Sequence, residues 1–335
     1  MPRRRWRLAL VAVPAIAALG GWWWVGSQLI EPARHRVARP ADFPAQVLQI
    51  PGAGRSIAAW WLDAGERAPA VLLLHGKRGD RASMLPRARL LGRHGFSVLL
   101  IDQQGHGETA GDAITFGWRE SADARSALAW LRRTDVARRV GVVGCSLGGA
   151  AVLLGPQPAG FDAVVLEAVY PRIARAIDNR IRLRVGPLAS ALTPLLVAQL
   201  RLRLGLGPAD LEPVRSIGRL GAPVLVVAGA EDAHTTLDES RELFEAAAAP
   251  KELWVVRGAR HQDFLSVDPA GYESAVVGFL TRHLRPAAGP IRPALAEHGR
   301  VALRRHDFAR RAPLDRSLRG FRHDRSSQSA AARLP

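Results

Sequence analysis

Residues 140–150 read Val-Gly-Val-Val-Gly-Cys-Ser-Leu-Gly-Gly-Ala, and this stretch decides the fold. A short β-branched run ends in a Gly-x-Ser-x-Gly pattern centred on Ser146, and an Ala/Leu-rich stretch follows. The pattern predicts a strand, a sharp turn and a helix, with Ser146 in a strained conformation and its hydroxyl above a sheet. Small residues two positions on either side are needed because neighbouring backbone passes close by. The alternative is a Gly-rich turn that only packs a helix on a strand, so other residues must support a nucleophile.

Apolar runs and amphipathic stretches alternate through most of the chain, which predicts an α/β fold with a doubly wound, mostly parallel sheet. The predicted strands cover residues 46–50, 56–62, 70–74, 96–101, 140–143, 163–166, 224–228 and 252–256. The predicted helices cover residues 83–93, 120–132, 147–154, 239–248 and 271–283. Between residues 170 and 220 the alternation stops, and an arginine-rich helical pattern predicts a short helical cap inserted over the C-terminal edge of the sheet.

The N-terminus has the composition of a membrane segment. Residues 8–30 carry no charged side chain, and at about 1.5 Å per residue they are long enough to cross a bilayer of about 30 Å. Arginines precede this stretch, so the positive-inside rule predicts a cytoplasmic N-terminus and an extracytoplasmic remainder, although arginines also follow it closely. A cleaved signal peptide is the alternative, and we favour an uncleaved transmembrane anchor over residues 1–30.

The remaining composition sets the boundaries of the globular part. Residues 31–45 read as a linker, and residues 286–335 as a basic, disordered tail. The net charge of +17 is almost all arginine, because only Lys77 and Lys251 are lysines. This charge reflects either an arginine-rich codon usage or attraction to anionic lipid or an acidic partner, and no nucleic-acid motif accompanies it. Cys145 is the only cysteine, so a disulfide framework and a thiolate metal site are excluded.

Two further residues can activate a serine hydroxyl, which is a poor nucleophile unless a base lies within hydrogen-bond distance and a third group orients that base. Asp232 follows the strand at 224–228, and His261 follows the strand at 252–256. Both lie just beyond C-terminal strand ends, at the edge where Ser146 must project. We predict His261 as general base and Asp232 as the residue that orients it. The carboxylates that compete with Asp232 are Glu231, Asp263, Asp238 and Glu167.

The developing oxyanion needs preorganised N–H donors. One is expected from the backbone of Leu147, directly after the nucleophile. The second should come from the loop that begins His75-Gly76-Lys77, where we choose the backbone N–H of Lys77 over that of Arg78. Nothing in the sequence has metal-ligand spacing or a phosphate-cradling loop, so we expect no metal and no cofactor.

Together these residues resemble the α/β-hydrolase superfamily over residues 46–285. The loop Asp102-Gln103-Gln104-Gly105-His106-Gly107-Glu108-Thr109 is similar to the superfamily's D-x-x-G-x-G-x-S motif, with Thr109 in place of serine. The elbow at Ser146, Asp232 and His261 complete the ordered set, although Ala259 and Arg260 precede the histidine where the superfamily usually has glycine. The N-terminal anchor and short insertion resemble the membrane-anchored, serine aminopeptidase-like hydrolases. The resemblance implies an α/β-hydrolase fold and a Ser-His-Asp triad.

The leading hypothesis is a serine hydrolase that forms an acyl-enzyme on Ser146 and cleaves an ester, thioester or amide. The anchor and the arginine-rich insertion favour a small-molecule or lipid-like acyl substrate near the membrane, and no nucleic-acid partner is expected. An acyltransferase could use the same residues, because fold alone does not set the reaction. The hypothesis from another class is a non-catalytic, membrane-tethered binding protein, which has no need of all three residues.

Overall fold

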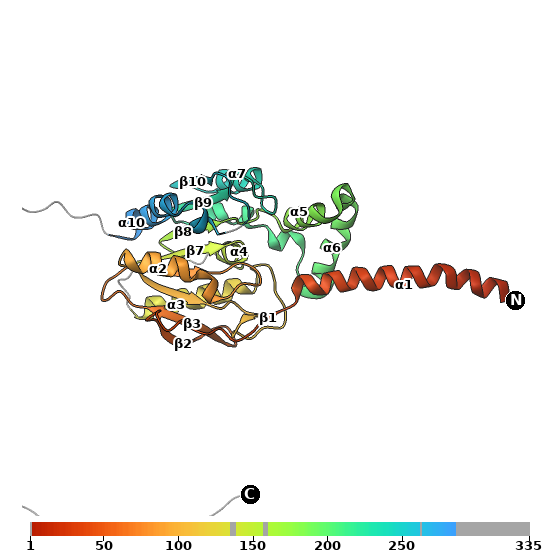
Figure 1. Cartoon of the computed structure of the whole chain (residues 1–335), viewed down its shortest axis with the longest axis horizontal. Helices are drawn as coiled ribbons and strands as arrows, with labels where there is room; N and C mark the ends of the chain where they lie inside the picture. The colour runs from red at the N-terminus through yellow and green to blue at the C-terminus, as the bar shows by residue number, and fades with distance from the viewer. Residues whose placement is uncertain (1, 135–138, 157–159, 262, 286–335) are drawn as a thin grey trace, which may run out of the picture. The chain divides into compact units, whose positions relative to one another are not determined.

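The computed structural model describes residues 2–134, 139–156, 160–261 and 263–285 of the chain. Eight strands form one sheet in the order β10-β9-β8-β7-β4-β5-β3-β2 (Figure 1). The pairs from β10 to β5 are parallel, and β3 pairs antiparallel with both β5 and β2. The strands are β2 (Gln46–Pro51), β3 (Ser56–Leu62), β4 (Ala70–Leu74), β5 (Ser97–Ile101), β7 (Val140–Cys145), β8 (Ala163–Glu167), β9 (Val224–Gly229) and β10 (Lys251–Val256). This is the α/β-hydrolase arrangement that the sequence predicts.

The N-terminal helix α1 (Pro2–Ile30) ends against the globular part. The strand β1 (Ala33–Arg34) follows it and pairs in parallel with β6 (His106–Gly107), a two-stranded sheet that the sequence did not reveal. The backbone N–H of Ile114 donates to the carbonyl of Ile30 at 2.7 Å, and Arg78 Nη2 donates to the carbonyl of Gln28 at 2.8 Å. These bonds fix the C-terminal end of α1 beside the loops that follow β4 and β5.

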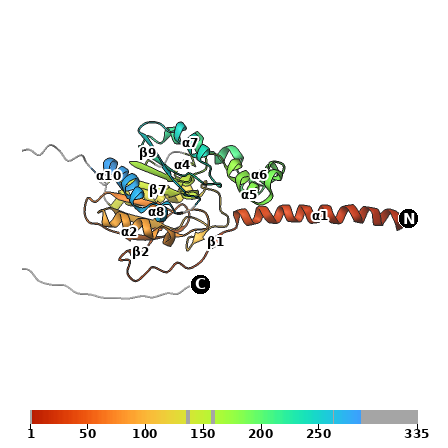
Figure 2. The same cartoon turned by 45° about the horizontal axis from the view of Figure 1, so that its top comes forward.

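The insertion folds as a helical hairpin. Helices α5 (Ile173–Val185) and α6 (Ala189–Leu204) pack against each other, and the short η2 (Gly186–Leu188) joins them. They lie beside the C-terminal end of α1 (Figures 1 and 2). Among the described residues, Ile173–Leu204 is one stretch long and apolar enough to cross a membrane. Because this stretch turns back on itself at η2, it does not form a single straight span. The short helices η3 (Pro208–Leu211), η4 (Pro213–Arg215) and η5 (Ile217–Arg219) lead to β9.

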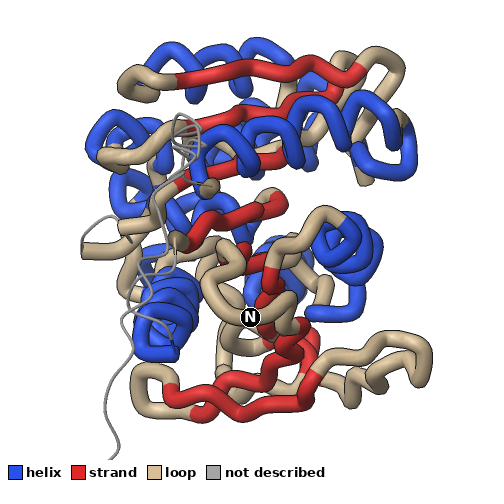
Figure 3. Tube along the Cα trace, turned by 90° about the vertical axis from the view of Figure 1, so that its left-hand side faces the viewer, coloured by secondary structure: helices blue, strands red, loops and turns tan. Residues whose placement is uncertain are grey.

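Helices cover both faces of the sheet (Figure 3). One face packs against α3 (Glu120–Thr134), α4 (Leu147–Leu153) and α7 (Leu237–Ala246). The other packs against α2 (Leu85–Arg93) and the C-terminal segments α8 (Phe264–Val267), α9 (Pro269–Tyr272), η6 (Glu273–Val277) and α10 (Gly278–Leu284). The predicted helix at 83–93 begins instead as a 3-10 turn, η1 (Arg81–Met84), which Asp80 caps by accepting from the Ser83 backbone N–H.

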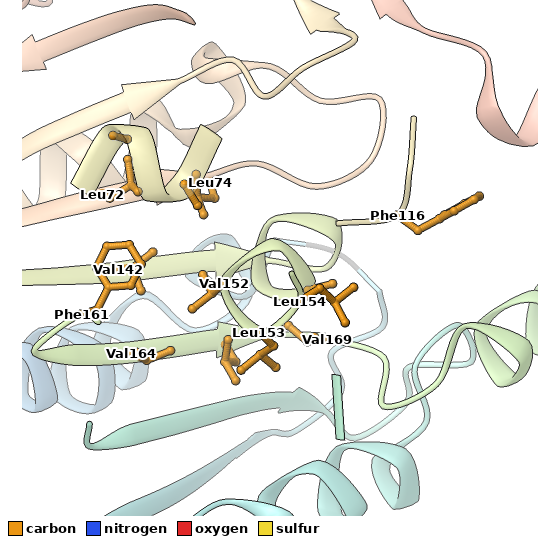
Figure 4. Packing of buried hydrophobic residues seen from close by; sticks show 14 of the residues in the cluster. Leu72, Leu74, Phe116, Val142, Val152, Leu153, Leu154, Phe161, Val164 and Val169 are labelled. Carbon is orange, nitrogen blue, oxygen red and sulfur yellow. The ribbon is translucent and has the colours of Figure 1, made fainter. Parts of the chain in front are cut away.

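The central strands are buried on both faces, which explains why they read as continuous apolar runs rather than alternating patterns. Every residue of β4, β5 and β8 is buried. Leu72 and Leu74 from β4, Val142 from β7 and Val164 from β8 pack in one cluster with the helix after the elbow (Figure 4). This packing holds β7 rigidly at the centre of the sheet, where the Ser146 elbow must be supported.

Candidate active site

Ser146 occupies the sharp turn between β7 and α4, as predicted. Its backbone has φ +48° and ψ −108°, a conformation that L-residues rarely adopt. A Cβ at Gly144 would lie 2.6 Å from the Cα of Gly149, and a Cβ at Gly148 would collide with the carbonyl of Leu74. The small residues around Ser146 are therefore required by close backbone approach. The strain indicates a functional position, because an ordinary connection would relax it.

Asp232 and His261 are brought together from adjacent strand ends. Asp232 follows β9, His261 follows β10, and His261 Nδ1 lies 2.7 Å from Asp232 Oδ2. The other carboxylate oxygen of Asp232 accepts from the backbone N–H groups of His234 and Thr235, at 2.7 and 3.0 Å. Burial raises the pKa of Asp232, but the hydrogen bond and charge of His261 and these two N–H groups outweigh it, so the net pKa is lowered. Asp232 is held as a buried carboxylate whose hydrogen bonds are satisfied.

The competing carboxylates have other partners. Glu231 is exposed and 3.9 Å from Arg260 Nε, whose side chain is 77% exposed. Asp238 pairs with a neighbouring arginine on the surface of α7. Asp263 is 2.7 Å from Arg87 Nη2. Of the residues considered as partners of the histidine, Asp232 is the one that hydrogen-bonds to His261.

One hydrogen bond expected of a Ser-His-Asp triad, that between the serine and the histidine, is not formed in the structure. Among the described residues, no hydrogen bond joins Ser146 Oγ to His261. Hydrogen bonds between a nucleophile and its base often form fully only in the substrate complex. The ring of a second histidine, His234, lies beside that of His261, with the centroids 5.1 Å apart and the planes tilted by 40°. His234 also lines the cavity that contains Ser146. The sequence analysis missed His234, and only its position two residues after Asp232 signals a role.

The residues predicted as oxyanion donors, Leu147 and Lys77, line the same cavity as Ser146. Leu147 is the first residue of α4, so its N–H has no partner within the helix. Lys77 and Arg78 form the centre of a turn in which the Gly79 N–H donates to the Gly76 carbonyl at 3.0 Å. Both side chains line the same cavity as Ser146 and Leu147. The geometry therefore keeps Lys77 and Arg78 as candidates for the second N–H donor.

A buried ionic network lies beneath the elbow, and the sequence analysis did not find it. Glu167, at the end of β8, accepts from Arg87 Nη2 at 2.6 Å and from the Tyr272 hydroxyl at 2.5 Å. Its backbone carbonyl accepts from the Ser146 N–H at 2.7 Å. Burial and the nearby Glu167 raise the pKa of the Cys145 thiol, although Arg87 opposes this, so the thiol stays protonated. Arg87 therefore links the nucleophile elbow to Asp263 in the histidine loop.

The loop after β5 has a structural role. Asp102 accepts from the backbone N–H groups of Arg81 and Glu108, at 2.7 and 2.8 Å, and forms a buried ion pair with the Arg81 guanidinium. Gly107 has φ +49°, and a Cβ there would collide with the Asp102 carboxylate. Thr109 Oγ1 accepts from the Ala58 N–H at 3.0 Å, so threonine supplies the acceptor where the related motif has serine. This loop carries β6 and so positions the chain that follows α1.

A cavity of about 1000 Å³ opens onto Ser146. The loops beside Ser146 form its floor, and α5 and α6 form one wall. Residues of α1, which include Trp22, Val25 and Leu29, form a further wall. Gln199 Nε2 on α6 donates to the Trp22 carbonyl at 2.8 Å, which joins the two walls. The lining is mainly apolar, so the cavity suits a hydrocarbon chain. Among the described residues, no group of three or more His, Cys, Asp or Glu side chains is placed to hold a metal ion.

Comparison with known proteins assigns the family. The sequence model described as the alpha/beta hydrolase family matches residues 71–275. The chain belongs to the alpha/beta hydrolase family. This alpha/beta hydrolase is 33% identical over 291 residues to an uncharacterized protein of Mycobacterium tuberculosis, covering 82% of the chain and 95% of the relative. It is 28% identical over 196 residues to the protein ABHD12B of Homo sapiens, covering 56% of the chain and 52% of that relative.

Solved structures share the fold. The Pyrococcus furiosus esterase Pf2001 has a TM-score of 0.63 and 22% identity, covering 77% of this chain and 99% of that one. The alpha/beta hydrolase GrgF of Penicillium has a TM-score of 0.57 and 18% identity, covering 72% of this chain and 99% of that one. At these identities the likeness shows the fold alone. Family and fold together support a hydrolase.

Proposed function

We propose that this alpha/beta hydrolase is a serine hydrolase that cleaves an ester, thioester or amide through an acyl-enzyme on Ser146. The observation that carries the proposal is the 2.7 Å hydrogen bond between His261 and buried Asp232, which follow β10 and β9 in the same parallel part of the sheet whose strand β7 ends at the strained Ser146. A nucleophile on a central strand, a base on a neighbouring loop and a buried orienting carboxylate are the parts that acyl transfer needs.

The residues take these roles in the proposed reaction. Ser146 Oγ attacks the acyl carbon while His261 Nε2 removes its proton, and the resulting imidazolium is stabilised through Nδ1–H by Asp232. The carbonyl oxygen becomes an oxyanion, and the backbone N–H groups of Leu147 and Lys77 donate to it. His261 then protonates the leaving alcohol, thiol or amine, and an acyl-enzyme remains on Ser146. Water, deprotonated by His261, attacks the acyl-enzyme and releases the acid.

We further propose that α1 anchors the protein in a membrane. Its apolar side chains Val13, Ile16 and Leu19 are 61–68% exposed, and such a surface needs lipid or another apolar partner to cover it. The other large exposed apolar side chains gather mainly on the α5–α6 hairpin and include Leu183, Leu188, Leu192 and Leu202. An apolar helix and an apolar cap on one cavity favour a lipid-like substrate that enters from the bilayer surface. The arginines at positions 3, 4, 5 and 7, which precede the apolar stretch at 8–30, favour an extracytoplasmic catalytic domain.

The test is active-site labelling of the full chain in nonionic detergent. We expect a fluorophosphonate probe to label the wild-type protein, and Ser146→Ala to abolish both labelling and ester hydrolysis, the latter by at least about 10³-fold. Thermal unfolding should show that Ser146→Ala is folded. Labelling or hydrolysis that persists in this variant would refute the assignment, and a folded wild type that neither reacts with the probe nor hydrolyses any acyl compound would favour the binding protein.

Acyl transfer is the second candidate. The relative described as polyketide transferase grgF, from Penicillium, is 23% identical over 286 residues, covering 69% of this chain and 94% of the relative. An alcohol in the cavity would attack the acyl-enzyme in place of water, and the mainly apolar walls favour this by limiting water access. Hydrolysis in the presence of glycerol distinguishes the two: a transferase forms mainly the glycerol ester, whereas a hydrolase releases mainly the free acid.

A further inference from the structure

The lining of the cavity at Ser146 combines apolar side chains with several cationic ones. The charged and titratable side chains among its lining residues are Lys77, Arg78, Arg180, Arg184 and His234. No aspartate or glutamate is among the described residues that line it. Because a partly desolvated cation without a counter-ion is costly, this imbalance points to a ligand that supplies the negative charge.

Three of these cations, Lys77, Arg180 and Arg184, form no ion pair with a carboxylate among the described residues. Arg78 lies 3.6 Å from Glu31, and Arg184 is exposed to solvent. Arg180 is half-buried and donates from Nη1 to the carbonyl of Ala176 in its own helix, at 2.9 Å. Lys77 Nζ lies 5.2 Å from the centre of the Phe116 ring. The charges of Asp232 and Glu239 act on Arg180 through space, but Arg180 forms no ion pair with either of them. The Lys77 ammonium and the Arg180 guanidinium are therefore the partly buried cations of the cavity that remain free to form an ion pair with a ligand.

Lys77 and Arg180 line the same cavity as Ser146 and His234, and the charge of Arg180 acts on other groups there. Burial, and then the positive charge of Arg180, lower the pKa of His234, whose ring lies beside that of His261 with the centroids 5.1 Å apart. Burial, and then the charges of Arg78 and Arg180, lower the pKa of Lys77 to about 8. Arg180 therefore acts electrostatically both on the histidine side and on the oxyanion-loop side of Ser146. An anion held here would share the cavity with Ser146.

We propose that Arg180, together with Lys77, binds an anionic group on the substrate, so that the preferred substrate carries a carboxylate or phosphate close to the acyl bond and an apolar chain. This inference rests on the proposed function of Ser146. The guanidinium would form a charge-assisted hydrogen bond with the anion, and the apolar chain would lie between α1 and the α5–α6 hairpin. Arg180 would thus determine specificity by selecting anionic over neutral esters.

The experiment compares two matched substrate pairs with the full chain in nonionic detergent. One pair is 1-dodecanoylglycerol and its 3-phosphate, and the other is the water-soluble 1-butanoylglycerol and its 3-phosphate. Release of the acid gives kcat/KM for each. We expect wild type to favour the phosphate by about 10-fold or more in both pairs, because hydrogen bonds to charged groups are among the stronger ones. The soluble pair separates recognition of the anion itself from attraction of the basic protein to a charged lipid surface.

The variants locate the preference at one side chain. Arg180→Leu should remove the phosphate preference in both pairs, and Arg180→Lys should keep part of it. Arg182→Leu is the matched control, because Arg182 lies on the same helix, outside the cavity lining, and pairs with Asp178 at 2.9 Å. This control should keep the wild-type preference. No preference in wild type, a preference confined to the long-chain pair, or one that survives Arg180→Leu would overturn the inference.

A measurement on wild type alone avoids dependence on a variant's folding. Dodecyl phosphate should slow fluorophosphonate labelling of Ser146 by about 10-fold or more at concentrations where dodecanol has little effect. Equal effects of the two amphiphiles would contradict the inference. Failure of the proposed function looks different, because acid release and labelling would then not depend on Ser146 at all, whatever the charge of the ester.

Discussion

The charge on Lys77 is expected to destabilise the folded protein, and its removal should therefore raise stability. The cavity lowers the pKa of this ammonium from 10.5 to about 8, through burial and then the charges of Arg78 and Arg180. The folded state thus holds the Lys77 proton less tightly than the unfolded chain does. In Lys77→Met the apolar stem remains, the backbone N–H proposed as an oxyanion donor is kept, and the charge is gone.

The magnitude follows from the shift in pKa. At about 1.4 kcal/mol per pKa unit, a fall from 10.5 to about 8 gives a destabilisation of about 3 kcal/mol at pH 7. Two effects reduce it: the side chain is partly exposed, and the variant loses the contact with the Phe116 ring, which is worth about 1 kcal/mol. We expect a net gain of about 1–2 kcal/mol, or about 2–8 °C in Tm for a domain of this size.

The sign can be checked by varying the pH. Because the folded-state pKa lies below the unfolded-state value, the destabilisation is fully present below pH 8 and disappears as the pH rises from 8 to 10.5. Thermal unfolding of wild type and Lys77→Met at pH 7, 8.5 and 10 should therefore show a difference in Tm that shrinks with pH. The only other lysine provides the control: Lys251 hydrogen-bonds to the carbonyls of Phe244 and Glu245, so Lys251→Met should lose stability rather than gain it. A lower Tm for Lys77→Met at pH 7, or a difference that does not change with pH, would refute the reasoning.

Three further changes test other parts of the molecule. Asp232→Asn should lower kcat for ester hydrolysis by about 10⁴-fold because His261 loses its orienting carboxylate, whereas Glu231→Gln should leave it within about 2-fold. Arg87→Met should cost about 3–5 kcal/mol in urea unfolding, because it leaves a buried carboxylate beneath the elbow unpaired; a loss under 1 kcal/mol would argue against that network. Gly26→Leu should push α1 from α6 and lower the kcat/KM ratio of dodecanoyl to butanoyl esters by about 10-fold, equivalent to about two methylenes of lost contact. At Gly20 a Cβ meets nothing within 4 Å, so an unchanged ratio in Gly20→Leu is the control.

The fold and the positions of the main candidate residues could be read from local patterns. Apolar runs of five or six residues mark strands buried on both faces, and the polar residues directly after them must emerge at one edge of a parallel sheet. For this reason the strand pattern predicts Ser146, Asp232 and His261 at the same edge of the sheet. The choice of Asp232 over its neighbour Glu231 rested on turn pattern alone, and only the structure shows which of the two hydrogen-bonds to the histidine.

Features that depend on distant pairs were not predictable in this way. Arg87 and Glu167 are 80 residues apart, and Tyr272 is 105 residues from Glu167, so no local pattern connects them. The β1–β6 pair has two residues in each strand, too few to show a period. Trp22 of α1 hydrogen-bonds to Leu195 and Gln199 of α6. Composition predicts a membrane anchor for the first segment and a helical cap for the second, and it gives no sign that the two are in contact. The basic tail at 286–335 lies outside the described residues, so its predicted disorder stays a prediction.

Because α1 lines the cavity, the same helix would affect both membrane attachment and substrate selectivity. In a membrane-anchored protein, a protease that cut the chain after residue 30 would release the domain and also remove one side of its substrate cavity. Proteolytic release would therefore change the substrate selectivity of the domain as well as its location. Substitutions that adapt the helix to a thicker or thinner bilayer would be constrained at Trp22, Val25 and Leu29, because these positions face the cavity. A soluble version that begins at the linker would accordingly have a different selectivity from the full chain.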